Sequence, residues 1–273
     1  MNKNEKVYYD AIEKVYNEGM YRDDRTGVGT RALFGTHMEF DLQDSFPVLN
    51  GKSVYFKGVM HELLWFLKGE TNIKYLKDNG IRIWDEWADE DGEVGKLYGY
   101  QWRNWENRDK NGQIEFIDQL SNVVTALKEN PMSRRHIITA WNPSHATQQN
   151  LPPCHILYQF YVTTDGHLDC QMYQRSADMF LGVPFDIASY AALTHLVANQ
   201  VGLTPRNLKI TLGDTHVYEN HITQVEEYLK RDIPSTKAKL YMGEGATIDN
   251  AMFADFKLTN YIPLSTIKAT VAV

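Results

Sequence analysis

Cysteine and histidine stand side by side in the segment Leu151-Pro-Pro-Cys-His155, at the start of a predicted strand. The two prolines restrict the backbone and would place the thiol of Cys154 at the end of an element. A lone intracellular cysteine is more often a buried small hydrophobe than a nucleophile, so this segment alone supports catalysis only weakly. Sequence neighbours on a strand point to opposite faces, and we therefore assign His155 no chemical step.

Arginines next to predicted strands are candidates for binding a phosphate, because guanidinium groups match phosphate oxygens bidentately. Each one taken alone could equally form a surface salt bridge. Gly27 and Gly29 would let backbone N–H groups approach the anion, although Gly-x-Gly by itself is a weak signal. The sequence contains no P-loop or Rossmann pattern, so it does not indicate that ATP or NAD binds. The candidate residues are Arg25, Arg134, Arg135, Arg175 and the adjacent Gln174 and Ser176.

Glu62 lies in an apolar helical segment, His61-Glu-Leu-Leu-Trp-Phe-Leu67. It could be an ordinary charged residue at a solvent edge. Its apolar neighbours also make it a candidate for a partly buried carboxylate that handles protons or organises water. The tryptophans would by default pack in the core, but a flat heteroaromatic ligand would give some of them a stacking role. They are Trp84, Trp87, Trp102 and Trp105.

Composition restricts the classes of function. The 273 residues are 43% apolar and carry a net charge of −7, which predicts a globular protein without a broad basic surface for nucleic acid. The first ten residues are polar, and no apolar run approaches the roughly 18 to 20 residues of a spanning helix. We expect a cytoplasmic protein with no membrane partner.

Cys154 and Cys170 provide neither a disulfide framework nor metal-ligand spacing, so we expect no metal.

Helical and strand patterns alternate along the chain without a repeat or a linker. This favours a single domain over residues 1–273 with a mixed α+β fold. Thr71 is expected to cap a short helix that ends at Gly80. Predicted helices cover residues 6–18, 55–68, 113–129 and a long segment from Pro184 to Gly202; predicted strands cover 32–42, 135–141, 156–163, 168–174 and 208–212.

Several of these segments together resemble the thymidylate synthase family, and the resemblance runs from the first helix to the end of the chain. It implies a single α/β domain with a mixed β-sheet packed by helices, and a homodimer formed through a sheet face. It also implies 5,10-methylenetetrahydrofolate as the carbon donor. The matching motifs are Arg25-Thr-Gly-Val-Gly-Thr30, His61-Glu-Leu-Leu-Trp-Phe-Leu67, Ile83-Trp-Asp-Glu-Trp87, Ser133-Arg-Arg135, Pro153-Cys-His155, Gln174-Arg-Ser-Ala-Asp178, Gly213-Asp-Thr-His-Val-Tyr218 and Val271-Ala-Val273.

The resemblance also implies roles for the matching residues. Cys154 would add to carbon 6 of a pyrimidine and make carbon 5 nucleophilic, which is covalent catalysis. Glu62 would organise water and protons, and Tyr98 would assist removal of the carbon 5 proton. The residues that would hold the phosphate are Arg25, Arg175 and Ser176, with Arg134 and Arg135 of the other subunit. Gln174 would belong to the nucleotide site, and His216 and Tyr218 would bind the sugar. The residues that would face the folate are Lys52, Trp84, Asp178 and Val273.

One departure from the family concerns the base. Members that act on dUMP have Pro-Phe-Asn where this chain has Pro184-Phe-Asp186. An asparagine amide accepts from nitrogen 3 of uracil and donates to oxygen 4, whereas cytosine reverses both groups. A carboxyl can accept from the cytosine amine and share a proton with the ring nitrogen, so the chain resembles the cytosine-specific dCMP hydroxymethylase and dCMP methylase. As a first-turn acid, Asp186 would be kept charged by the helix dipole.

Three functions follow from this sequence. We favour one-carbon transfer to dCMP, with a slight preference for the hydroxymethyl over the methyl product. The alternative is a thymidylate synthase that converts dUMP to dTMP. A third hypothesis is a nucleotide- or RNA-binding module that has lost catalysis, and the set of Cys154, Glu62, Tyr98 and the arginines disfavours it. At the folate end, Lys52 lacks the neighbouring threonines usual in the family, and Thr270 replaces a proline.

Overall fold

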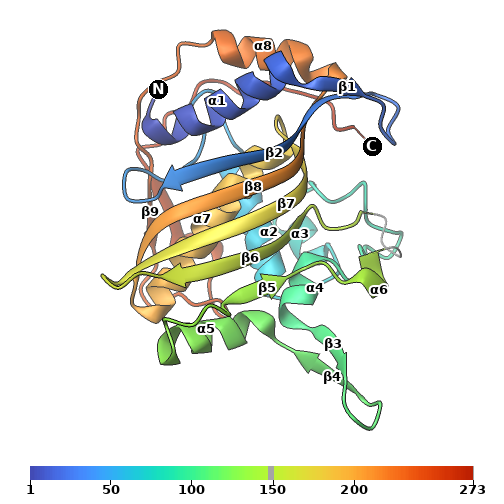
Figure 1. Cartoon of the computed structure of the whole chain (residues 1–273), viewed down its shortest axis with the longest axis vertical. Coiled ribbons are helices and arrows are strands. Elements are labelled where there is room, and N and C mark those ends of the chain that lie inside the picture. Colours follow the sequence, from blue (N-terminus) through green and yellow to red (C-terminus); the bar gives the residue numbers. More distant parts are fainter. Residues whose placement is uncertain (147–150, 273) are drawn as a thin grey trace.

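The centre of the fold is a six-stranded mixed sheet, and the computed structural model describes residues 1–146 and 151–272. The strand order is β1-β2-β8-β7-β6-β5 (Figure 1). Neighbouring strands are antiparallel except β7 and β8, which are parallel and are joined by a helix. The strands are β1 Met20–Arg22, β2 Thr30–Asp41, β5 Ile137–Thr139, β6 His155–Val162, β7 His167–Asp178 and β8 Thr204–Tyr218.

Helices cover one face of this sheet and confirm the predicted mixed α/β class. The long helix α7 (Gly182–Val201) packs against β7 and β8, and α2 (Phe56–Leu67) packs against α7 (Figure 1). Most side chains of both helices are buried, which accounts for their apolar sequences. The other helices are α1 Lys3–Glu18, α3 Lys74–Asp78, α4 Tyr98–Arg103, α5 Gln119–Glu129, α6 Pro143–Ala146 and α8 Ile222–Lys230, with short 3₁₀ turns at Glu219–His221 and Phe253–Asp255.

The opposite face of the sheet carries large apolar side chains that are open to solvent. On β6, Tyr161 is 58% exposed and Leu157 37%. Strand alternation explains the pattern, because Tyr158 and Phe160 between them are buried on the other face of the sheet. This open face is where the predicted subunit contact would form.

Two local predictions were wrong. Residues 113–129 do not form one helix: β4 (Ile114–Ile117) pairs with β3 (Trp105–Arg108) in a hairpin, and α5 starts after Asp118, whose side chain accepts from the N–H of Ser121. Thr71 does not cap α3, because its hydroxyl donates to Glu93 at 2.6 Å. A side-chain hydrogen bond, rather than apolar periodicity, determines where α5 begins, whereas α3 begins after Ile73 without a side-chain cap. A second small hairpin joins β9 (Lys239–Met242) and β10 (Phe256–Thr259).

The helix that carries Asp186 begins earlier than its sequence indicates. Pro184 lies in the first turn and Gly202 ends the helix with φ of 73°, as predicted. The helix starts at Gly182, however, and its first turn contains no acidic residue. Asp186 therefore lies in the second turn, and its interpretation as a first-turn acid was wrong. No helix among the described residues is long and apolar enough to cross a membrane.

Candidate active site

A cavity of about 710 Å³ opens where β6, β7 and β8 meet the N-terminal turns of α7. It gathers most of the predicted site residues from segments that are far apart in the sequence. Among the described residues, no group of three or more His, Cys, Asp or Glu is arranged to hold a metal ion. The predicted residues that line the cavity are Arg25, Glu62, Trp84, Tyr98, Cys154, Gln174, Arg175, Ser176, Asp178, Asp186, His216 and Tyr218.

Cys154 stands immediately before β6 and faces this cavity. Its backbone N–H donates to the Tyr98 hydroxyl at 2.8 Å, and its carbonyl accepts from the N–H of Arg175 at 2.8 Å. The Arg175 guanidinium donates to the carbonyls of Pro153 (2.8 Å) and Pro152 (2.9 Å), so the loop before the thiol is tied to β7. Burial raises the pKa of the Cys154 thiol, and the charge of Arg175 opposes this increase.

Glu62 projects from α2 and is held by a single tryptophan. The indole N–H of Trp84 donates to a Glu62 carboxyl oxygen at 2.6 Å. Burial raises the pKa of Glu62 to about 7, and the Trp84 hydrogen bond limits the increase. A carboxyl with this pKa exchanges protons readily at neutral pH, as a general acid or base must.

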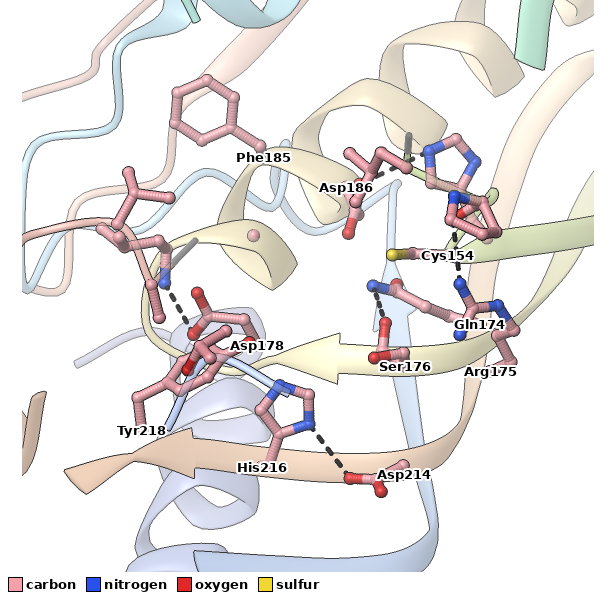
Figure 2. A pocket seen from close by; sticks show the side chains of 18 of the residues that line it. Cys154, Gln174, Arg175, Ser176, Asp178, Phe185, Asp186, Asp214, His216 and Tyr218 are labelled. Atoms are coloured by element: carbon pink, nitrogen blue, oxygen red, sulfur yellow. Dashed lines mark hydrogen bonds and ion pairs between the residues drawn. The ribbon is translucent and has the colours of Figure 1, made fainter. Parts of the chain in front are cut away.

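Asp186 faces the same space as the Cys154 sulfur and the Gln174 amide (Figure 2). Burial raises the pKa of Asp186 well above its usual range, and the nearby charge of Glu62 raises it further. Burial thus favours the protonated form of Asp186, contrary to the expectation that the helix dipole favours its charged form. The physical reason is its position in the second turn, inside the cavity wall.

His155 belongs to the cavity wall although the sequence suggested no role for it. The alternation of side chains on a strand does not separate it from Cys154, because Cys154 precedes β6 and the pairing register shifts between His155 and Leu157. Its ring stacks on Tyr98 with centroids 4.0 Å apart, and its Nδ1 lies 2.7 Å from the Tyr190 hydroxyl. Its Nε2 is 3.8 Å from an Asp186 carboxyl oxygen.

The amide of Gln174 is buried beside these groups. Its nitrogen donates to the Ser176 carbonyl at 3.0 Å, as Figure 2 shows, whereas its oxygen has no hydrogen-bond partner among the described residues. An unsatisfied acceptor in a cavity wall is available to a donor on a ligand.

The arginine end of the cavity includes residues that the sequence analysis missed. Arg22 forms an ion pair with Asp214 at 2.7 Å, and Asp214 also contacts Nδ1 of His216 at 3.0 Å (Figure 2). Asp214 and His216 lie two residues apart on β8, so their side chains point to the same face of the sheet. This spacing within the Gly213-Asp-Thr-His motif could have predicted their contact. Arg134 and Arg135 are exposed and do not line the cavity of their own chain.

The other end of the cavity is apolar. Trp84 and Trp87 line it, whereas Trp102 is in the core and Trp105 is on β3. Lys52 does not face the cavity: its ammonium donates to the Phe180 carbonyl, and burial lowers its pKa to about 8. Val271 and Ala272 reach the cavity, and Val273 lies outside the described residues. Further apolar lining residues are Ile83, Leu181 and Phe185.

A thiol opposite two protonatable carboxyls, between an arginine-rich end and a tryptophan-rich end, suits covalent group transfer between an anionic ligand and a flat one. The thymidylate synthase family model matches residues 6–273. The chain therefore belongs to the thymidylate synthase family, which confirms the resemblance seen in its motifs. Members transfer a one-carbon unit from methylenetetrahydrofolate to carbon 5 of a pyrimidine nucleotide.

We expect Trp84→Phe to move the ionisation of Glu62 to higher pH. A hydrogen bond to a charged group is worth about 1.5–3 kcal/mol, and its loss removes the group that stabilises the carboxylate. The limb of the kcat/KM profile that belongs to Glu62, near pH 7 in the wild type, should rise by at least about one pH unit. Trp87→Phe is the matched control, because the Trp87 ring adjoins Trp84 without bonding Glu62. An unmoved limb in Trp84→Phe would contradict the assignment.

Proposed function

We propose that this chain transfers a one-carbon unit from 5,10-methylenetetrahydrofolate to carbon 5 of dCMP. The observation that carries the proposal is the Asp186 carboxyl, which faces the same cavity as the Cys154 thiol. Family members that act on dUMP have an amide at this position. Burial favours the protonated carboxyl by raising the pKa of Asp186, and in that form it can supply the hydrogen that the bare ring nitrogen of cytosine lacks.

Covalent catalysis begins at Cys154. Its sulfur bonds to carbon 6 of the base, the electron pair of the carbon 5–carbon 6 double bond moves to carbon 5, and carbon 5 then attacks the one-carbon unit. Loss of the carbon 5 proton then breaks the bond between the one-carbon unit and the folate nitrogen and leaves an exocyclic methylene on carbon 5. Hydride from tetrahydrofolate gives a methyl group there, or water gives a hydroxymethyl group, and departure of the Cys154 thiolate from carbon 6 restores the double bond. The Tyr98 hydroxyl, bonded to the Cys154 N–H, and the Glu62 carboxyl are the proton-handling groups placed for these transfers.

Arginines and β8 residues provide the contacts for the rest of the nucleotide. Arg25 and Arg175 would hold the phosphate with the Ser176 hydroxyl, and His216 and Tyr218 would bind the sugar. Burial raises the pKa of Tyr218 to about 12, so its phenol stays a hydrogen-bond donor.

Arg134 and Arg135 would act on the site of a second subunit in a homodimer. Their exposure supports this proposal, as do the exposed apolar side chains of Leu157 and Tyr161 on the open sheet face.

The folate would lie at the apolar end. Trp84 and its neighbours offer flat apolar walls, and Asp178 offers a carboxyl whose geometry is set by the N–H groups of Phe180 (2.9 Å) and Leu181 (3.3 Å). The bound folate would supply the one-carbon unit. Lys52 has no part in this proposal because its ammonium is directed into the protein, and the role of Val273 stays a prediction.

A thymidylate synthase acting on dUMP is the second candidate, and one observation favours it. A neutral carboxylic acid, like an amide, has one donor and one acceptor. The protonated Asp186 could therefore also bind uracil. A binding module without catalysis is disfavoured because Cys154, Glu62 and Tyr98 meet in one cavity. Methyl and hydroxymethyl products are distinguished by product mass and by whether dihydrofolate forms.

Replacement of Cys154 tests the covalent step. Cys154→Ala should reduce turnover below detection while dCMP still binds with near-normal affinity, because the phosphate and base contacts belong to other residues. Turnover is measured by product mass and affinity by titration calorimetry. Cys170→Ala is the matched control: Cys170 is buried on β7, outside the cavity, and should leave turnover near normal. Substantial turnover by Cys154→Ala would exclude this residue as the nucleophile.

Mixed dimers test the shared site. Arg135→Ala and Cys154→Ala should each be inactive or severely impaired, because one removes a phosphate contact and the other the nucleophile. After subunit exchange, heterodimers contain one site with both wild-type residues, so up to about half of the sites per heterodimer regain activity. Mass spectrometry of differently tagged subunits establishes exchange. Demonstrated exchange without recovered activity would contradict donation of Arg135 across the interface.

Exchange of Asp186 for asparagine tests the choice of base. An amide presents its donor and acceptor in the order that uracil needs, and each mismatched buried polar group costs about 1–3 kcal/mol. Asp186→Asn should therefore shift the ratio of kcat/KM for dCMP and dUMP toward dUMP by roughly a hundredfold. Both specificity constants are measured for wild type and variant with methylenetetrahydrofolate. A wild type that prefers dUMP would make thymidylate synthase the better assignment.

A further inference from the structure

We propose that Tyr190 and His155 form a positioning pair that determines which oxygen of Asp186 carries the proton, and that this makes the site select cytosine over uracil. The inference rests on the proposed function, because it concerns the choice between dCMP and dUMP at the same site.

A protonated Asp186 does not select a base by itself. Cytosine needs a donor opposite its ring nitrogen 3 and an acceptor opposite its amine, and uracil needs the reverse. A carboxylic acid satisfies either order, depending on which of its two oxygens carries hydrogen. Unlike an amide, whose nitrogen and oxygen are fixed covalently, it depends on neighbouring groups for its orientation.

His155 is the neighbour that can determine which Asp186 oxygen donates and which accepts. It is buried and held between Tyr98, which stacks on its ring, and Tyr190, whose hydroxyl is 2.7 Å from its Nδ1. Burial lowers the pKa of His155 to about 3, so the imidazole is neutral and carries one N–H. Its Nε2 faces Oδ1 of Asp186 at 3.8 Å. The carboxyls of Glu62 and Asp178 disfavour ionisation of Asp186, whereas a hydrogen bond from the Gln174 side chain favours it.

Tyr190 determines which nitrogen of His155 has the hydrogen. Burial raises the pKa of Tyr190 well above its usual value, so the phenol keeps its O–H. Nδ1 of His155 is the hydroxyl's single hydrogen-bond partner among residues 1–146 and 151–272. If Nδ1 donated, the buried O–H hydrogen would have no acceptor, which costs about 1–3 kcal/mol. The hydroxyl therefore donates to Nδ1, and the imidazole hydrogen is on Nε2.

An N–H that faces Oδ1 makes this oxygen the acceptor and leaves the acid proton on Oδ2. The separation of 3.8 Å is longer than a hydrogen bond, and such contacts in ligand-free sites commonly shorten when substrate binds. With Oδ1 toward the substituent on carbon 4, the cytosine amine donates to Oδ1 and ring nitrogen 3 accepts from Oδ2. Uracil would place its oxygen 4 against an acceptor.

Tyr190→Phe tests this pair, because it removes only the hydroxyl. We expect the ratio of kcat/KM for dCMP to that for dUMP to fall by about tenfold, as follows from the loss of one hydrogen-bonded constraint. In ¹⁵N-histidine NMR spectra of the free protein, the wild type should show the hydrogen of His155 on Nε2, and the variant should show a mixture of both tautomers.

Tyr158→Phe is the matched control. The Tyr158 ring packs 5.3 Å from the Tyr190 ring in the same buried cluster, and its hydroxyl has no partner among the described residues. It should change neither the base ratio nor the His155 tautomer. An equal effect of both substitutions would show a general packing effect and overturn the pair.

The outcomes separate the inference from the proposed function. A wild type that prefers dCMP, with an unchanged ratio in Tyr190→Phe, overturns the positioning pair and leaves the dCMP assignment intact. A wild-type His155 with its hydrogen on Nδ1 overturns the pair without any variant. A wild type that prefers dUMP overturns the dCMP assignment together with the selection of cytosine.

Discussion

Removal of two carboxyl groups from water is the constraint on which this site depends. Glu62 and Asp186 come from α2 and α7, and burial raises the pKa of each. Ionisation of one makes ionisation of the other more costly, since like charges interact strongly where water is excluded. The cavity therefore favours a protonated carboxyl close to the Cys154 thiol. A reaction that adds a nucleophile to a ring and later removes a ring proton needs such a store of protons.

The parallel connection from β7 through α7 to β8 places these groups together. The pairing of β7 with β8 sets Asp178 opposite His216 and Ser176 opposite Asp214. The last residues of both strands therefore present polar side chains at one end of the sheet. The helix between them starts at the same end and brings Asp186 into the cavity in its second turn. A parallel pair requires such a crossover, and binding sites in α/β proteins commonly form outside the ends of the strands. The site thus follows from one topological unit, to which the segment before β6 adds the nucleophile Cys154.

Much of this arrangement could be predicted from the sequence where the signal is local. Apolar periodicity located α2 and α7, and Gly202 marked the end of α7 because a left-handed residue suits glycine. The protonation of Asp186 could not be predicted, because it depends on where the helix begins and on Glu62, about 120 residues away in the sequence. The direction of Lys52 could not be predicted for a similar reason: its ammonium donates to the Phe180 carbonyl, a contact between distant segments.

His155 shows why a motif can identify a residue without revealing its chemistry. As the neighbour of the nucleophile it has no evident role, and only the tertiary contacts with Tyr98, Tyr190 and Asp186 give it one. An exchange of asparagine for aspartate changes more than a side chain, because the covalent distinction between donor and acceptor is lost. Hydrogen bonds from neighbouring groups must then restore that distinction. Specificity for a base in this cavity is consequently a property of the chain of contacts from Tyr190 to Asp186, and the carboxyl alone does not determine it.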